Sequence, residues 1–209
     1  MFWLCAIMNA CTNPQPHDTV RFLFIADHSL SFFKRYTFPD PSLFKYLCIK
    51  VSEKGTIDFR YGIVGSNSDV PFDRYYLPYK EKVNKNPWLS QGNQAQGSQD
   101  QSWDDFEATV RGKLNAPASR YSDISSTIKH SIACFQERTA GVDNSKVRKV
   151  LLLCTDYKDS FSDIPALPPD IEVIAVSILP TATIEHILHT KVQRFENLQA
   201  AIDFISQSL

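Results

Sequence analysis

The stretch Val20-Arg-Phe-Leu-Phe-Ile-Ala-Asp27-His-Ser29-Leu-Ser31 joins a strongly apolar run to an acid and two alternating serines. Its branched and aromatic residues are typical of a central strand that is covered on both faces. In an open α/β sheet, ligands bind just beyond the carboxyl ends of such strands. The stretch therefore predicts a site built from oxygen atoms at the end of the first strand. Hard cations such as Mg²⁺ prefer that set of ligands.

Length and composition limit the class of protein. The chain has 209 residues, the size of one ordinary domain with a sizeable core. It carries 22 basic and 23 acidic residues, a balance that argues against a nucleic-acid partner. No C-x-x-C pair occurs among the five cysteines. Cys48, Cys134 and Cys154 lie in apolar runs and are predicted to be small buried hydrophobic residues.

Residues 1–17 combine a short apolar start with a polar, proline-containing tether. The apolar part is shorter than the roughly 20 residues that span a bilayer. Ala10-Cys11, followed by polar residues, resembles the cleavage site of a bacterial lipoprotein. We therefore expect a bacterial cell-envelope protein with a membrane tether through lipidated Cys11. The alternative is an apolar tail that packs on the domain or frays, in a cytoplasmic protein.

Residues 18–209 are predicted to form a single domain in which strands and helices alternate. Strands are expected at about 20–27, 43–51, 56–64, 146–156, 171–178 and 192–195, and helices at about 31–36, 103–114, from 122, 183–189 and 197–208. Because only Ser52–Gly55 separates the second and third strands, these are predicted to form an antiparallel hairpin. The segment 65–102 lacks periodicity and is predicted to be a long flexible insertion.

This order predicts an α/β fold. We expect a Rossmann-like, doubly wound, mostly parallel six-stranded sheet of order 3-2-1-4-5-6, with strand 3 antiparallel and helices on its faces. Strands 1 and 4 are neighbours in that order, so Asp27 and Asp156 would meet where their strands end. The loop before the helix that starts near Ser122 would add a hydroxyl group.

The separate motif pieces resemble the metal-ion-dependent adhesion site (MIDAS) of von Willebrand factor type A (vWA) domains. The resemblance covers nearly the whole chain from about residue 18. It implies a vWA-like fold in which an ion, Mg²⁺ or else Mn²⁺ or Ca²⁺, is held by Asp27, Ser29, Ser31, Ser122 and Asp156. It also implies a protein partner that supplies an acidic side chain to the ion. The chain departs from the family at Ser122, where the family has threonine, and at Tyr157, where it has glycine.

The leading functional hypothesis is a non-enzymatic, divalent-metal-dependent protein-interaction module. One alternative is a metal-dependent hydrolase of phosphate or sulfate esters that uses the same acidic residues at the strand ends to activate water. The other is a metal-free structural scaffold, in which the acids form turns and the serines cap helices. The neighbouring His28 is expected to pack rather than bind the ion, and His186 and His189 lack the partners of a zinc site.

Overall fold

The computed structural model describes residues 19–29, 32, 40–64, 72–79, 102–115, 122–138, 146–157 and 164–208. The predicted tether at 1–17, most of the helix expected at 31–36, and Ser31 lie outside these ranges. The strands are β1 Thr19–Asp27, β2 Thr56–Val64, β3 Asp73–Leu77, β4 Val147–Cys154, β5 Ile171–Val176 and β6 Gln193–Phe195. The helices are α2 Leu43–Ser52, α3 Trp103–Leu114, α4 Ile124–Gln136, α5 Thr181–Leu188 and α6 Leu198–Ser208.

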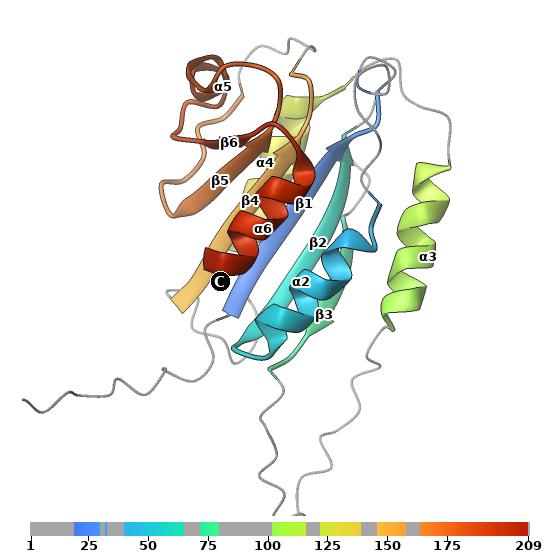
Figure 1. Cartoon of the computed structure of the whole chain (residues 1–209). Coiled ribbons are helices and arrows are strands. Elements are labelled where there is room, and N and C mark those ends of the chain that lie inside the picture. Colours follow the sequence, from blue (N-terminus) through green and yellow to red (C-terminus); the bar gives the residue numbers. More distant parts are fainter. Residues whose placement is uncertain are drawn as a thin grey trace, which may run out of the picture.

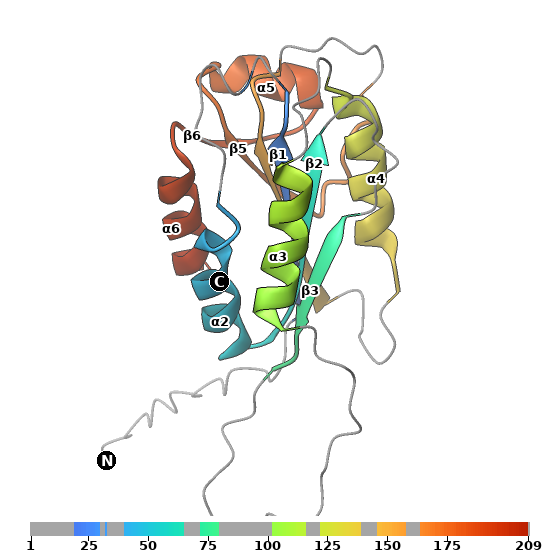
Figure 2. The ribbon, with the colours of Figure 1, turned by 90° about the vertical axis from the view of Figure 1, so that its right-hand side faces the viewer.

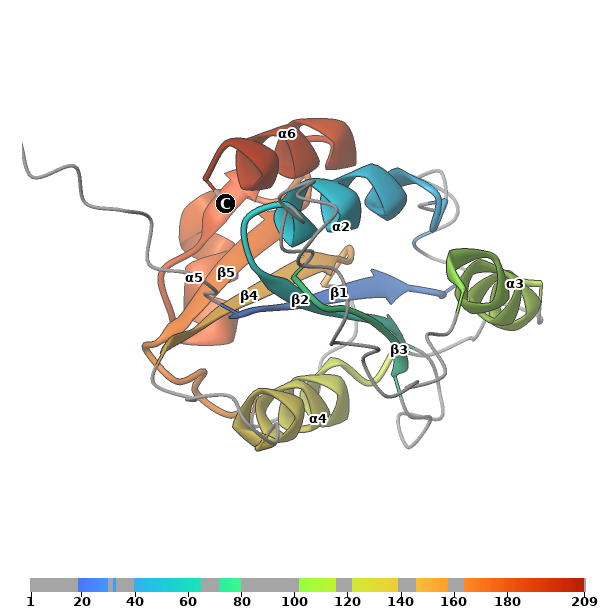
Figure 3. The same ribbon diagram turned by 90° about the horizontal axis from the view of Figure 1, so that it is seen from below.

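All six strands form one sheet of order β3-β2-β1-β4-β5-β6 (Figure 1). β3 runs antiparallel to β2, and every other neighbouring pair is parallel. The predicted fold class, strand order and antiparallel third strand are confirmed, but different residues form the second and third strands than the sequence predicted. Seen from below, α2 and α6 lie on one face of the sheet and α4 lies on the other (Figure 3).

The strand predicted over 43–51 is wrong, because these residues belong to α2. Phe44, Leu47, Cys48 and Val51 are buried at the i, i+3, i+4, i+7 spacing of one helix face. The helix connects β1 to β2, which pair in parallel with Thr19 opposite Thr56. The antiparallel hairpin predicted between 43–51 and 56–64 therefore does not form.

The antiparallel strand is instead β3, inside the stretch for which the sequence predicted a long loop. Exposed and half-buried side chains alternate along it. Tyr75 packs against Trp103 and Phe106 of α3, with ring centroids 5.0 and 5.7 Å apart. Aromatic contacts with a helix that starts 26 residues after β3 ends thus hold this edge strand in place. Residues 80–101 lie outside the described part of the chain.

Successive side chains of β1 point to opposite faces of the sheet, and each face carries its own apolar core. Phe22 and Phe24 face α2, α3 and α6, whereas Leu23 and Ile25 face α4 and α5. The three described cysteines are buried free thiols, as predicted. Burial raises the pKa of the Cys154 thiol to about 12. Among the described residues, no helix combines the length and apolar character needed to cross a membrane.

A buried ionic cluster lies where α4 ends. Arg21 of β1 donates to the carbonyls of Cys134, Phe135 and Glu137, which close the last turn of that helix, at 2.9–3.1 Å. It also pairs with Asp58 of β2 at 3.1 Å. Burial would raise the pKa of Asp58, but Arg74 and Arg60 outweigh it and hold that pKa below its usual value.

Candidate functional site

Asp27, the last residue of β1, is the centre of the candidate site. It is fully buried and accepts hydrogen bonds from three directions. Its Oδ1 accepts from the Ser29 backbone at 2.9 Å and from the Ser122 hydroxyl at 3.0 Å. Its Oδ2 accepts from the Thr155 hydroxyl at 2.7 Å. Segments 95 and 128 residues away in the sequence therefore meet at one carboxylate.

The start of α4 brings Ser122 to the site. Figure 2 shows this end of the helix at the same edge of the sheet as the tips of β1 and β2. Asp123 is the N-cap residue, and its carboxylate accepts from the Ser126 backbone at 2.9 Å. Capping therefore occupies Asp123 and fixes the position of the preceding serine.

The residues that follow β4 form the other wall of the site. Thr155 Oγ1 accepts from the Tyr157 backbone at 3.2 Å while it donates to Asp27. Asp156 lies between them and is buried. Its Oδ2 atom accepts no hydrogen bond from any residue of the structure, although the residue has other contacts.

Tyr157 adopts a left-handed backbone with φ of 52°, a conformation that is uncommon for a bulky residue. This is the position at which the sequence departs from the glycine of the family. Its side chain is buried in the core beneath α4 and α5. The loop thus keeps a glycine-like backbone and compensates for the strain with apolar contacts.

The predicted site residues converge as far as the structure describes them. Asp27, Ser29, Ser122 and Asp156 are all buried at the carboxyl ends of β1 and β4. Ser29 makes a local turn, with its hydroxyl accepting from the Phe32 backbone at 3.3 Å. Ser31 lies outside the described residues. His28 points elsewhere, with its Nε2 3.1 Å from the Leu114 carbonyl oxygen, as expected for a packing residue.

Sequence reasoning missed Thr155, which contacts both Asp27 and the following loop. The available signal was its place next to Asp156, where a hydroxyl at a strand end can reach the neighbouring strand. The buried hydroxyls of Thr155 and Ser122 thus orient the carboxylate of Asp27.

The candidate site offers oxygen donors to a metal ion. Carboxylate and hydroxyl oxygens alone suit a hard divalent cation rather than a soft one. The described ranges contain no cluster of three or more His, Cys, Asp or Glu side chains placed to hold a metal. The chemistry of the donors, two carboxylates and several hydroxyls, is nevertheless the one that an ion of the Mg²⁺ class prefers.

Comparisons with known proteins gave only structural similarities. The chain matches no family model, and no curated protein matches it. Proximal thread matrix protein 1 (PTMP1) from the mussel byssus is similar over 92% of this chain, with 12% identity and a TM-score of 0.44. The chain spans 47% of that protein, about half its length.

Two further structures are similar at the same low level. A PTMP1 structure with a zinc-occupied MIDAS motif has 13% identity and a TM-score of 0.44; the match covers 92% of this chain and 47% of PTMP1. The VWA domain of SpRpn10 has 9% identity and a TM-score of 0.47; that match covers 88% of this chain and 93% of the domain.

Proposed function

We propose that this chain, whose fold is vWA-like as the sequence predicted, is a divalent-metal-dependent protein-interaction module. Asp27, Ser29, Ser31, Ser122 and Asp156 would hold the ion. The ion, of the Mg²⁺ class, would supply an electrophilic centre that takes an acidic side chain from the partner. The observation that carries the proposal is the 3.0 Å contact between Ser122 and Asp27, which joins two of the motif pieces at one buried carboxylate.

Charge supports binding of a cation at this edge of the sheet. Asp27 and Asp156 are buried acids at the ends of two neighbouring strands, β1 and β4. Two nearby carboxylates repel each other, and a divalent ion would neutralise them. Hydroxyl ligands add no charge, so the bound ion would keep affinity for an anionic group. This favours exchange of an outer ligand over hydrolysis.

One observation favours the metal-free scaffold as a second candidate. Three hydrogen bonds already satisfy the Asp27 carboxylate. Asp27, Ser29, Ser122 and Thr155 are therefore held together by protein contacts alone. In that case the same edge of the sheet would bind partners without an ion. The two candidates therefore differ in whether the chain binds a divalent ion.

Calorimetric titration of the full chain with Mg²⁺ and Mn²⁺ tests the proposal. We expect saturable binding that weakens at least about tenfold in Ser122→Ala and Asp156→Asn, because each loses one oxygen ligand or its charge. Asp203→Asn, on the exposed face of α6, is the matched control and should titrate like the parent.

Each outcome separates the candidates. Binding that is equal in all four proteins would place the ion elsewhere and refute the site. A parent that binds neither ion would leave the scaffold as the function. Turnover of an aryl phosphate or sulfate that is lost in Asp156→Asn would instead assign the hydrolase.

We also propose, on the sequence alone, that the protein is tethered to a bacterial cell envelope through lipidated Cys11. Mass spectrometry of the protein from cells would show whether the chain begins at Cys11 with added acyl chains.

A further inference from the structure

Helix α2 carries three of the five large hydrophobic side chains that are exposed in the described part of the chain. These are Leu43, Tyr46 and Ile49, at 39%, 61% and 45%. The opposite face of α2 is buried on the sheet through Phe44, Leu47, Cys48 and Val51. The helix is therefore apolar on its inner face and presents a second, smaller apolar stripe to the outside.

Lys45 lies on one side of this outer stripe, and Lys50 lies within it, between Tyr46 and Leu43. At about 100° per residue, Ile49 and Tyr46 lie about 60° apart around the helix, with Lys45 about 40° beyond Ile49 and Lys50 about 40° beyond Tyr46. The Lys50 ammonium lies 4.8 Å from the centre of the Tyr46 ring. Lys45 is 3.5 Å from exposed Asp104. Glu53 is the one acid on the outer face of α2 and its C-terminal turn, and it lies at the end of the stripe.

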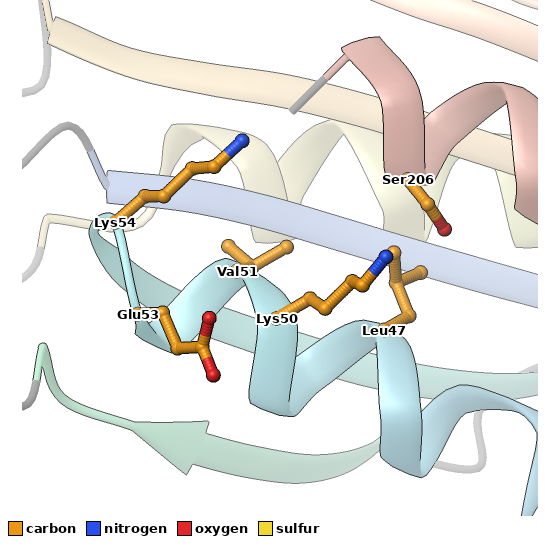
Figure 4. Close-up of a pocket in the computed structure, with 6 residues that line it drawn as sticks. All are labelled: Leu47, Lys50, Val51, Glu53, Lys54 and Ser206. Atoms are coloured by element: carbon orange, nitrogen blue, oxygen red, sulfur yellow. The ribbon is translucent and has the colours of Figure 1, made fainter.

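A shallow hollow of about 160 Å³ adjoins the stripe between α2 and α6. Figure 4 shows Lys50 and Lys54 extending beside Leu47 and Val51, with Ser206 of α6 across the hollow. No salt bridge joins either lysine to an acid in the described part of the chain. The Glu53 carboxylate also lines the hollow, so two ammonium groups and one carboxylate border the small apolar area offered by Leu47 and Val51, and the lysines outnumber the acid.

We propose that the outer face of α2 docks on an anionic lipid bilayer. The stripe is convex, and its three apolar side chains offer far less area than the roughly 800 Å² that each partner buries in a stable protein interface. Insertion into a bilayer interface needs only a few apolar side chains and nearby basic residues. Lys50 within the stripe and Lys54 at the hollow supply the charge complementary to acidic headgroups.

The position of α2 agrees with this orientation. Thr19, where β1 begins, is paired in register with Thr56, four residues beyond the end of α2. The segment that precedes residue 19 therefore joins the domain at the same edge as the C-terminal end of α2. The candidate metal site lies at the opposite edge, where β1 and β4 end (Figure 1). A bilayer against α2 would leave that edge open to a partner.

Vesicle sedimentation of the full, unlipidated chain tests the proposal. Vesicles of phosphatidylcholine alone are compared with vesicles containing phosphatidylserine, in chelator, so that the result is independent of the metal site. The variants are Tyr46→Ser with Ile49→Ser, and Lys50→Gln with Lys54→Gln. Ile178→Ser is the matched control, because Ile178 is 54% exposed but lies after β5, away from α2.

We expect the parent to bind anionic vesicles only. The variant with Tyr46→Ser and Ile49→Ser should bind about tenfold more weakly, and in the other variant each lysine replaced should weaken binding about fivefold, while the control binds like the parent. Equal binding of the parent and both α2 variants would overturn the proposal, because residues 1–18 are present in every protein. A parent that does not bind would overturn it as well. So would a dimer, detected by light scattering, that the apolar pair disrupts, since a second copy would then cover α2.

Discussion

Replacing Thr155 by valine removes one hydroxyl from the centre of the candidate site and keeps the shape of the side chain. That hydroxyl donates to Asp27 Oδ2 at 2.7 Å and accepts from the Tyr157 backbone at 3.2 Å. All three residues are buried, so water cannot readily replace either bond. The substitution therefore affects a carboxylate and a backbone N–H together.

The two losses set the expected magnitude. A hydrogen bond to a charged group contributes about 1.5–3 kcal/mol, and a buried donor that loses its acceptor costs about 1–3 kcal/mol. With values near the lower end of both ranges, we expect Thr155→Val to lower the free energy of unfolding by about 3 kcal/mol. With a urea slope of about 2 kcal/mol per M, the unfolding midpoint falls by about 1.5 M. A less firmly oriented Asp27 should also weaken Mg²⁺ binding by about tenfold.

Urea unfolding and Mg²⁺ titration of Thr155→Val, Thr155→Ser and the parent measure both effects. The serine variant keeps the hydroxyl and should lose only about 1 kcal/mol for the missing methyl group. Thr109→Val, on the exposed face of α3, also loses a hydroxyl that donates, at 2.9 Å to the Asp105 carbonyl, and should change little. If the valine and serine variants at Thr155 unfold at the same urea concentration, the hydroxyl does not support the site and the reasoning fails.

Two further predictions concern the backbone at the site and the acids at the far end of α4. Tyr157→Gly should be more stable than Tyr157→Ala by about 1 kcal/mol, because both lose the side chain but only glycine tolerates a φ of 52° without cost; calorimetric melting in the opposite order would contradict a strained backbone. Hydrogen bonding to Arg60 lowers the pKa of Glu137, and arginines lower the pKa of Asp58, from usual values of 4.5 and 3.8. Their stabilisation is therefore complete above those values and is lost as the pH falls through the lower folded pKa. The free energy of unfolding should decrease as the pH is lowered below about 4, and it should decrease less steeply in Asp58→Asn than in the parent. If the urea midpoints of the two proteins fall with the same slope against pH, Asp58 is not a cause of the decrease.

The placement of Asp27 and Asp156 at neighbouring strand ends was predictable, because its signals are local and chemical. Asp27 and Asp156 each end an apolar run, and the strand order alone brings those runs together. Thr155 could not be assigned in the same way. A threonine near the end of a strand is common, and only the register of β1 against β4 turns its hydroxyl into a partner of Asp27.

The two errors in the strand prediction have opposite physical origins. Residues 43–51 contain enough aromatic and branched side chains for a strand, and their outer positions Leu43, Tyr46 and Ile49 are apolar as well. Because these exposed apolar residues fall between the buried ones in the sequence, the helical spacing of the buried residues cannot be recognised from the sequence. The strand β3 was missed for the opposite reason: its five residues are half polar, and contacts with α3 across 25 residues hold it.

The geometry of β1 explains how the fold places a hydroxyl beside Asp27. The 13 residues of α4 extend about 20 Å, and the six steps from Arg21 to Asp27 along β1 extend about the same distance. Arg21 closes the last turn of α4, while Asp27 accepts from Ser122 just before its first turn. One strand thus holds both ends of one helix. Because Arg21 is bonded both to the carbonyls that end α4 and to Asp58 of β2, it fixes the position of α4 along β1. Ser122 then stays within 3.0 Å of the carboxylate, so the ionic cluster and the candidate metal site are two ends of the same arrangement.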